Sequence, residues 1–97
     1  MSRNKDEKPL KELVNQMLRA YGLGAKLDEI SLVKSWEKIV GKMIAKHTTD
    51  IFFKEGRLYI ELDSAPLRQE LSYAKSKLID KLNEEAGKKM VNEIIFR

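Results

Sequence analysis

Leu32–Thr48 has the sequence LVKSWEKIVGKMIAKHT and holds the only tryptophan and the only histidine of the chain. Its apolar residues recur at helical spacing, which predicts an amphipathic helix with one face turned to a core. They are Leu32, Val33, Trp36, Ile39, Val40, Met43 and Ile44. We expect Trp36 to be the largest buried anchor. Because cutting a buried Trp to Ala costs about 3–5 kcal/mol, Trp36→Ala should nearly unfold a domain of this size.

Gly41 lies inside this predicted helix. Glycine in a helix interior costs about 1 kcal/mol relative to alanine, so a local requirement is expected there. Either another backbone packs closely against Gly41 or the helix kinks. A further interpretation is that Gly41 forms the floor of a groove for a partner. Tight packing predicts that Gly41→Leu destabilises the domain by overpacking.

A second helical stripe precedes this segment. Met1–Lys8 is polar, and we expect it to be a flexible tail. Pro9 suits the first turn of a helix, and Gly22 suits a left-handed helix stop, so a helix is predicted over residues 9–21. Its apolar positions are Leu10, Leu13, Val14, Met17, Leu18 and Tyr21. Residues 23–26 form a linker, and residues 27–30 lead into the central helix.

After Thr48 the apolar period changes from 3.6 to 2, which predicts a β-hairpin with its turn at Gly56. Ser64 is the expected N-cap of a third helix, and Gly87 is its expected stop. Residues 90–97 form a last strand that returns to the hairpin sheet. The order α-α-β-β-α-β predicts one α+β domain over residues 9–97, with a three-stranded sheet covered by helices on one face.

Composition limits the function classes. The chain has 97 residues, no cysteine and a net charge of +4, with basic and acidic residues interleaved. Disulfides and cysteine zinc sites are excluded, and no apolar run approaches a membrane span. No nucleophile–base pair, phosphate loop or metal-ligand cluster stands out, so the sequence predicts no enzyme, no cofactor and no small-molecule substrate. We expect a cytoplasmic protein.

Two interpretations of the basic residues remain open. Lys54 and Arg57 flank the hairpin turn, while Lys77, Lys81 and Lys88 lie near one another at helical spacing, with Arg68, Lys75 and Lys89 around them. They form either a solvated flank of the apolar stripe or a weak phosphate-contacting surface for nucleic acid.

The histidine and the hairpin aromatics also have alternative roles. His47, whose only nearby acid in sequence is Asp50, is interpreted as a structural residue bonded to backbone, rather than a catalytic base or metal ligand. Tyr59 either covers the sheet edge or stacks on a base. Phe52 and Phe53 point to opposite faces of a strand, so one is core and the other is a candidate anchor for a protein partner.

An ordered set of residues resembles the core signature of the DciA-like family, long described as a domain of unknown function. Trp36, Gly41, His47 and Gly56 belong to this signature, and the resemblance covers residues 8–97. The remaining matching positions are Ile39, Val40, Ala45, Thr48, Leu58, Leu62, Ser64, Glu70, Leu71, Leu82, Asn83, Gly87, Val91 and Ile94.

The resemblance implies a type II KH-like domain that binds DNA weakly and assists the loading or operation of the DnaB-type replicative helicase. One departure concerns the mechanism. KH domains clamp the nucleic-acid backbone with a GxxG loop, and no two glycines here are three positions apart. The alternative hypothesis is a stand-alone KH-shaped domain that binds single- or double-stranded DNA, or RNA, without a helicase partner.

Overall fold

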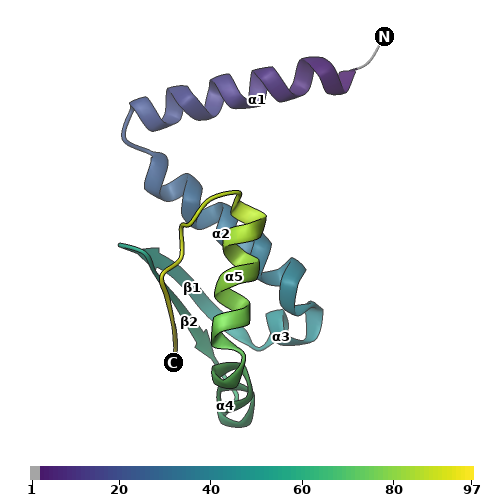
Figure 1. Ribbon diagram of the computed structural model, residues 1–97, viewed down its shortest axis with the longest axis vertical. Helices are drawn as coiled ribbons and strands as arrows, with labels where there is room; N and C mark the ends of the chain where they lie inside the picture. The colour runs from purple at the N-terminus through teal and green to yellow at the C-terminus, as the bar shows by residue number, and fades with distance from the viewer. Residues whose placement is uncertain (1–2) are drawn as a thin grey trace.

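The computed structural model describes the backbone of residues 3–97 and the side chains of residues 9–97 (Figure 1). The elements along the chain are α1 (Arg3–Ala20), α2 (Gly24–Val40), α3 (Lys42–Lys46), β1 (Thr48–Lys54), β2 (Arg57–Leu62), α4 (Ala65–Tyr73), α5 (Lys75–Ala86) and β3 (Glu93–Phe96). If α2 with α3, and α4 with α5, are each taken as one broken helix, the predicted α-α-β-β-α-β order of an α+β fold is confirmed.

The three strands form one sheet in the order β1-β2-β3. β1 and β2 are the antiparallel hairpin, and β3 runs parallel to β2. The parallel pairing needs a crossover, which α4 and α5 supply. The last strand therefore returns to the hairpin sheet as the sequence predicts, and β2 becomes the central strand.

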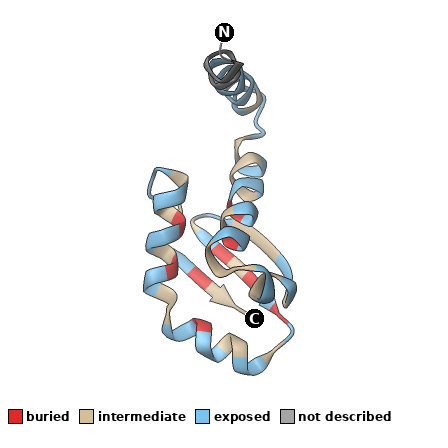
Figure 2. Cartoon of the chain, turned by 90° about the vertical axis from the view of Figure 1, so that its right-hand side faces the viewer, coloured by how far each residue is buried: buried red, intermediate tan, exposed pale blue. Residues whose placement is uncertain are grey.

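The core lies between the sheet and the helices α2 and α5 (Figure 2). Leu58 and Ile60 of β2 are fully buried, as the alternating pattern predicts. Trp36 is 1% exposed, and its ring lies 6.1 Å from the ring of Phe96. The indole Nε1–H donates to Thr48 Oγ1 at 3.1 Å, so the polar atom of this buried side chain has a partner. Trp36 is thus the anchor that the sequence indicates.

Gly41 separates α2 from α3 instead of lying within one helix. Its φ of 87° and ψ of 173° belong to a region that essentially only glycine occupies. A Cβ built there would meet nothing within 4 Å. Tight packing at Gly41 is therefore wrong, and a break in the helix is the reason for the glycine.

The helix predicted after the hairpin is also divided, at Ala74. Its start is confirmed, because Ser64 Oγ accepts a hydrogen bond from the Leu67 backbone N–H at 3.3 Å. Its stop is confirmed as well, since Gly87 has φ 73° in the left-handed region. Ala74 is the only residue between α4 and α5, so no four-residue loop of the GxxG kind lies between these two helices.

Asn83 ties the end of α5 to the segment that leads into β3. Its Oδ1 accepts the backbone N–H groups of Met90 and Val91 at 2.9 and 2.7 Å, and its Nδ2 donates to the Val91 carbonyl at 2.9 Å. The Asn83 side chain thus satisfies both backbone hydrogen-bonding groups of Val91, which is fully buried, as a neighbouring strand would.

α1 extends away from the rest of the molecule (Figure 1). It begins at Arg3, so Pro9 lies inside the helix. The expected place of Pro9 in the first turn is therefore wrong. Residues 3–8 of the expected tail are helical, and Met1 and Ser2 lie outside the described residues. The linker is shorter than expected because α2 already begins at Gly24.

Candidate binding surfaces

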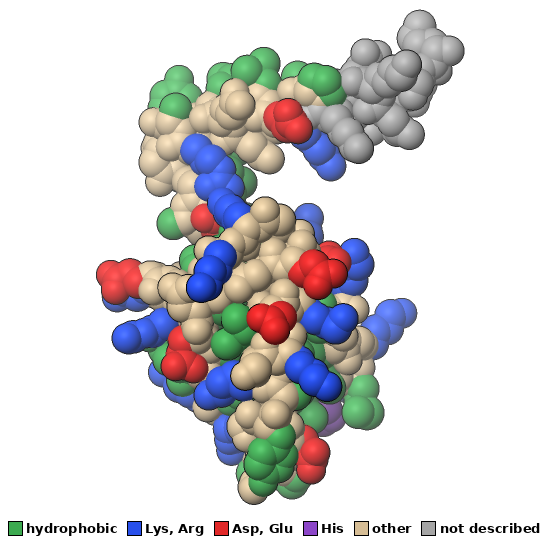
Figure 3. All heavy atoms as spheres, viewed as in Figure 1, with side chains coloured by type: hydrophobic (Ala, Val, Ile, Leu, Met, Phe, Trp, Pro, Cys, Tyr) green, Lys and Arg blue, Asp and Glu red, His purple; other side chains and the backbone are tan. Residues whose placement is uncertain are grey.

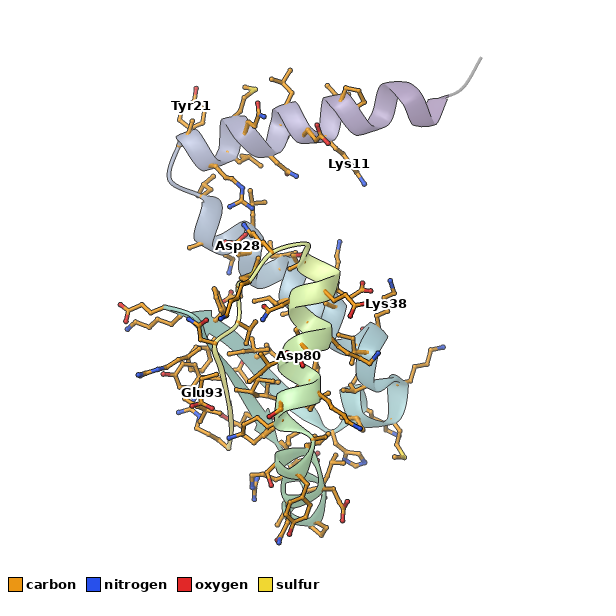
Figure 4. The ribbon with its side chains drawn as sticks, viewed as in Figure 1. Lys11, Tyr21, Asp28, Lys38, Asp80 and Glu93 are labelled. Atoms are coloured by element: carbon orange, nitrogen blue, oxygen red, sulfur yellow. The ribbon has the colours of Figure 1, made fainter. Side chains whose placement is uncertain are left out.

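The apolar side of α1 is exposed. We use the name α1 stripe for Leu10, Leu13, Val14, Met17 and Tyr21, whose exposed fractions run from 43% at Val14 to 78% at Tyr21. Figure 3 shows apolar side chains along the outer side of this helix, and in Figure 4 Tyr21 points away from the body while Lys11 points beneath the helix. α1 therefore turns its apolar face to solvent and its polar face to the protein.

Beneath α1 lies a cleft of about 580 Å³ between α1, α2 and the segment after α5. Four basic side chains line it, namely Lys11, Arg19, Lys34 and Lys88, with one acid, Asp28. The carboxylate of Asp28 lies 2.8 Å from the Arg19 guanidinium and raises the pKa of Arg19 by hydrogen bonding and by charge. Within residues 9–97, Lys34 and Lys88 form no ion pair. The electrostatics of this basic cleft suit an anionic ligand.

The structure divides the basic residues singled out in the sequence among three places. Lys54 and Arg57 are cross-strand partners at the turn end of the hairpin. Lys77 and Lys81 are exposed on α5. Lys88 follows the left-handed Gly87, so helical spacing does not relate it to the two α5 lysines, and it lines the basic cleft instead.

His47 occupies the junction between α3 and β1. Its Nδ1 lies 2.8 Å from Asp63 Oδ1, and its carbonyl accepts the Asp63 backbone N–H at 3.1 Å. The ring partner is therefore Asp63, at the end of β2, and neither a backbone group nor Asp50. No group of three His, Cys, Asp or Glu side chains suited to a metal occurs in the described part of the chain. These contacts fit a residue that fastens two strand ends.

The two adjacent phenylalanines point to opposite faces, as predicted. Phe53 packs against the core. Phe52 lies on the other face, where its ring stacks on Tyr59 with centroids 4.6 Å apart and planes 11° apart. The guanidinium carbon of Arg97 is 5.2 Å from the Phe52 centroid and 5.3 Å from that of Tyr59. Tyr59 stands on the central strand, so its expected place at the sheet edge is wrong.

Gly56 is needed for the hairpin turn. Its φ is +79°, and a Cβ there would lie 2.5 Å from Asn92 Nδ2. The Gly56 carbonyl accepts the Asn92 backbone N–H at 2.7 Å, which fixes the start of β3 against the turn. The role of Gly56 is structural.

Some of the surface could not be found by reading the chain in order. The apolar spacing of α1 is visible in the sequence, but its exposure to solvent is not, and no sequence pattern pointed to Lys11, Arg19 or Lys34 as binding residues. On α1, the i, i+4 and i+8 spacing of Lys11, Asn15 and Arg19 indicates that these three residues share one face. That this face meets Lys34 and Lys88 depends on how three separate elements pack.

Comparisons with known proteins agree with one another. A family model described as "Dna[CI] antecedent, DciA" matches residues 9–96. A UPF0232 protein of Mycobacterium marinum is 26% identical over 90 residues, which cover 93% of this chain and 48% of that protein. A UPF0232 protein of Corynebacterium glutamicum is 25% identical over 85 residues, or 88% of this chain and 48% of that protein. The chain thus spans about half the length of these curated relatives.

One further relative, from Mycolicibacterium smegmatis, is described as a UPF0232 protein in the recF-gyrB intergenic region. It is 26% identical over 93% of this chain and 46% of its own length. Within the described residues, no helix is long and apolar enough to cross a membrane.

Proposed function

Because this chain belongs to the DciA family, we propose that it is a non-enzymatic binding module that assists the loading or operation of the DnaB-type replicative helicase. The observation that carries the proposal is the family match over residues 9–96, almost the whole chain. The family description, "Dna[CI] antecedent", supports a role beside the replicative helicase.

We assign the helicase contact to the α1 stripe. Contiguous apolar side chains exposed on a monomer mark interaction sites, and the α1 stripe has the i, i+3, i+4, i+7 spacing of a helix that binds in an apolar groove. Among the α1 side chains that the structure describes, Pro9 to Ala20, none is buried. A groove on the helicase would therefore cover side chains that the chain itself leaves in water.

Weak DNA binding is the second part of the proposal. The basic cleft collects four cations from α1, α2 and the segment after α5. Lys54 and Arg57, which the sequence also offered for nucleic acid, are not included, because Asp50 and Glu61 lie on the same face of the hairpin. Lys77 and Lys81 extend the basic surface along α5. Few phosphate contacts imply low affinity and a modest loss of binding with salt.

The helicase contact is tested by mixing the chain with its cognate helicase, with and without a short single-stranded DNA, and measuring mass by chromatography with light scattering. We expect co-elution of the wild type and loss of co-elution for Met17→Glu. The matched control is Met43→Glu, because Met43 is 69% exposed on α3 and lies outside the α1 stripe. Separate elution of the wild-type chain and helicase would contradict the proposal. Separate elution with a shift on DNA alone would instead favour the stand-alone nucleic-acid-binding domain.

The DNA contact is tested by fluorescence anisotropy at low salt. Lys34→Ala with Lys88→Ala removes two charges from the basic cleft and should weaken binding of a labelled oligonucleotide. Lys42→Ala with Lys46→Ala removes the same charge from α3 and should leave binding nearly unchanged. Equal losses in both double variants would show that only net charge matters and would contradict a site in the cleft.

A further inference from the structure

The face of the sheet turned away from α2 and α5, which we name the open face, carries a regular arrangement of charges. Leu58, Ile60 and Leu62 of β2 are buried on the helix side, so the residues that alternate with them lie on the open face. Strand register then places nine residues in three rows across β1, β2 and β3. The first row is Lys54, Arg57 and Glu93, the middle row is Phe52, Tyr59 and Ile95, and the third row is Asp50, Glu61 and Arg97.

The outer rows set like charges opposite each other within the chain. Lys54 pairs with Arg57 across the hairpin, and Asp50 pairs with Glu61. Like charges directly opposite in an antiparallel pair are destabilising. Within residues 9–97, none of these four side chains forms an ion pair. In the isolated chain, neither repulsive pair is relieved by an ion pair.

We propose that the open face binds the open face of a second copy of this chain, related to the first by a two-fold axis along the middle row. That rotation exchanges the first and third rows. Lys54 then faces Asp50 of the second copy, and Arg57 faces Glu61. On the β3 side of the sheet, Glu93 faces Arg97 of the second copy. Every outer-row charge meets its opposite, and the middle row meets itself.

The middle row supplies the apolar centre of this interface. Phe52, Tyr59 and Ile95 are half-buried and run across all three strands. Two sheets packed face to face lie about 10 Å apart, which brings two such rows into contact. An apolar centre with a charged rim is the usual composition of a protein interface, and a two-fold axis makes one face serve both partners.

A second copy fits this face better than a nucleic acid does. The six outer-row charges sum to zero, so a phosphate backbone attracted to Lys54 and Arg57 would be repelled by Asp50 and Glu61. Glu93 and Arg97 contribute least to the attraction between the two copies. The Glu93 carboxylate already lies 3.7 Å from Lys75 Nζ, and the Arg97 guanidinium lies near the Phe52 and Tyr59 rings. The charges on β1 and β2 thus determine the specificity of the pairing between two copies.

Charge reversal tests the proposal. Light scattering of the wild type over a concentration series should approach twice the 11.2 kDa mass of the chain. Arg57→Glu and Glu61→Arg should each weaken self-association by about tenfold or more, because each turns two attractions in the dimer into repulsions. An equimolar mixture of the two variants should associate again, since an acidic face then meets a basic one.

Both variants should keep the fold. Arg57→Glu puts an acid opposite Lys54 but beside Glu93, and Glu61→Arg puts a base opposite Asp50 but beside Arg97, so each exchanges one like-charge neighbour for another. Melting curves of the two monomers close to that of dilute wild type check this point. A wild type that stays monomeric at millimolar concentration would overturn the proposal. So would a dimer that Arg57→Glu leaves intact and Leu13→Glu dissociates, because the contact would then lie on the α1 stripe.

Discussion

Helices α1 and α2 have the same kind of apolar stripe and opposite environments. In α2, Leu32 and Trp36 are 1% exposed, whereas in α1 Leu10 is 61% and Tyr21 is 78% exposed. α2 packs against α5 and β1, while the contacts of α1 within the described chain are with α2. Apolar periodicity thus predicts that a segment is helical and which side is apolar, but the neighbours that cover this side come from elsewhere.

This difference bears on how each helix is held. A lone helix of this length is marginal in water, and most helices in proteins depend on packing of their apolar face. α2 has that packing within the chain. The α1 stripe lacks that packing within the described residues, which is why we propose it for the helicase contact.

The largest expected effect is on the α2 side. Trp36→Ala should lower the free energy of unfolding by about 3–5 kcal/mol, since it leaves a cavity between α2 and the sheet and removes the donor to Thr48. Tyr21→Ala, the aromatic change on α1, should stay within about 0.5 kcal/mol. Urea unfolding followed by circular dichroism measures both. Equal losses would mean that α1 is packed as closely as α2.

A smaller effect on stability is expected at Asn83, whose side chain holds the segment that leads into β3. Asn83→Ala should cost about 2–3 kcal/mol, because it leaves the buried Val91 N–H without its acceptor. Asn15→Ala provides the control on the polar side of α1 and should be nearly neutral. The same urea titration compares them. A neutral Asn83→Ala would show that water replaces the side chain and that this end of the core is open.

The break between α2 and α3 should give an effect of about 1–3 kcal/mol. Gly41→Ala forces a Cβ into a backbone region that side chains avoid, although space is available there. Gly41→Leu should cost about the same, because backbone strain and not crowding sets the penalty. Thermal melts of the two variants distinguish these causes. A much larger loss for leucine would restore the packing interpretation that the geometry contradicts.

The smallest effect on stability is expected for the α1 stripe itself. Leu13→Glu combined with Met17→Glu should change the free energy of unfolding of the body by less than about 0.5 kcal/mol, since both side chains are more than half exposed. The tryptophan fluorescence of Trp36 reports unfolding of the body without contribution from another tryptophan. A clear loss of stability would indicate that the α1 stripe is covered within the free chain.

Local chemistry made much of the fold predictable. The spacing around Trp36, the alternation of Leu58 with Ile60, and the cap at Ser64 each follow from interactions close in sequence. Ala74 could not be foreseen as a break, because alanine is the best helix former and gives no local sign of one. The break there depends on how α4 and α5 fit the sheet.

The candidate surfaces were less predictable for the same reason. His47 meets Asp63 sixteen positions away, and Lys88 joins Lys11 and Lys34 only after three elements pack. The like-charge pairs of the hairpin follow from the register that its two-residue turn sets, and the register shift between Thr48 and Asp50 lies beyond them. The packing of separate elements is set by contacts far apart in sequence, and the pattern of any one segment does not encode it.

Hydrogen–deuterium exchange of the chain, free and with its cognate helicase, tests most directly whether α1 is a docking helix and α2 a core helix. We expect fast exchange of α1 amides in the dilute free chain, slow exchange of α2 amides, and added protection of α1 when the helicase is present. Slow exchange of α1 in the free chain, or no change of α1 on addition of the helicase, would contradict this expectation.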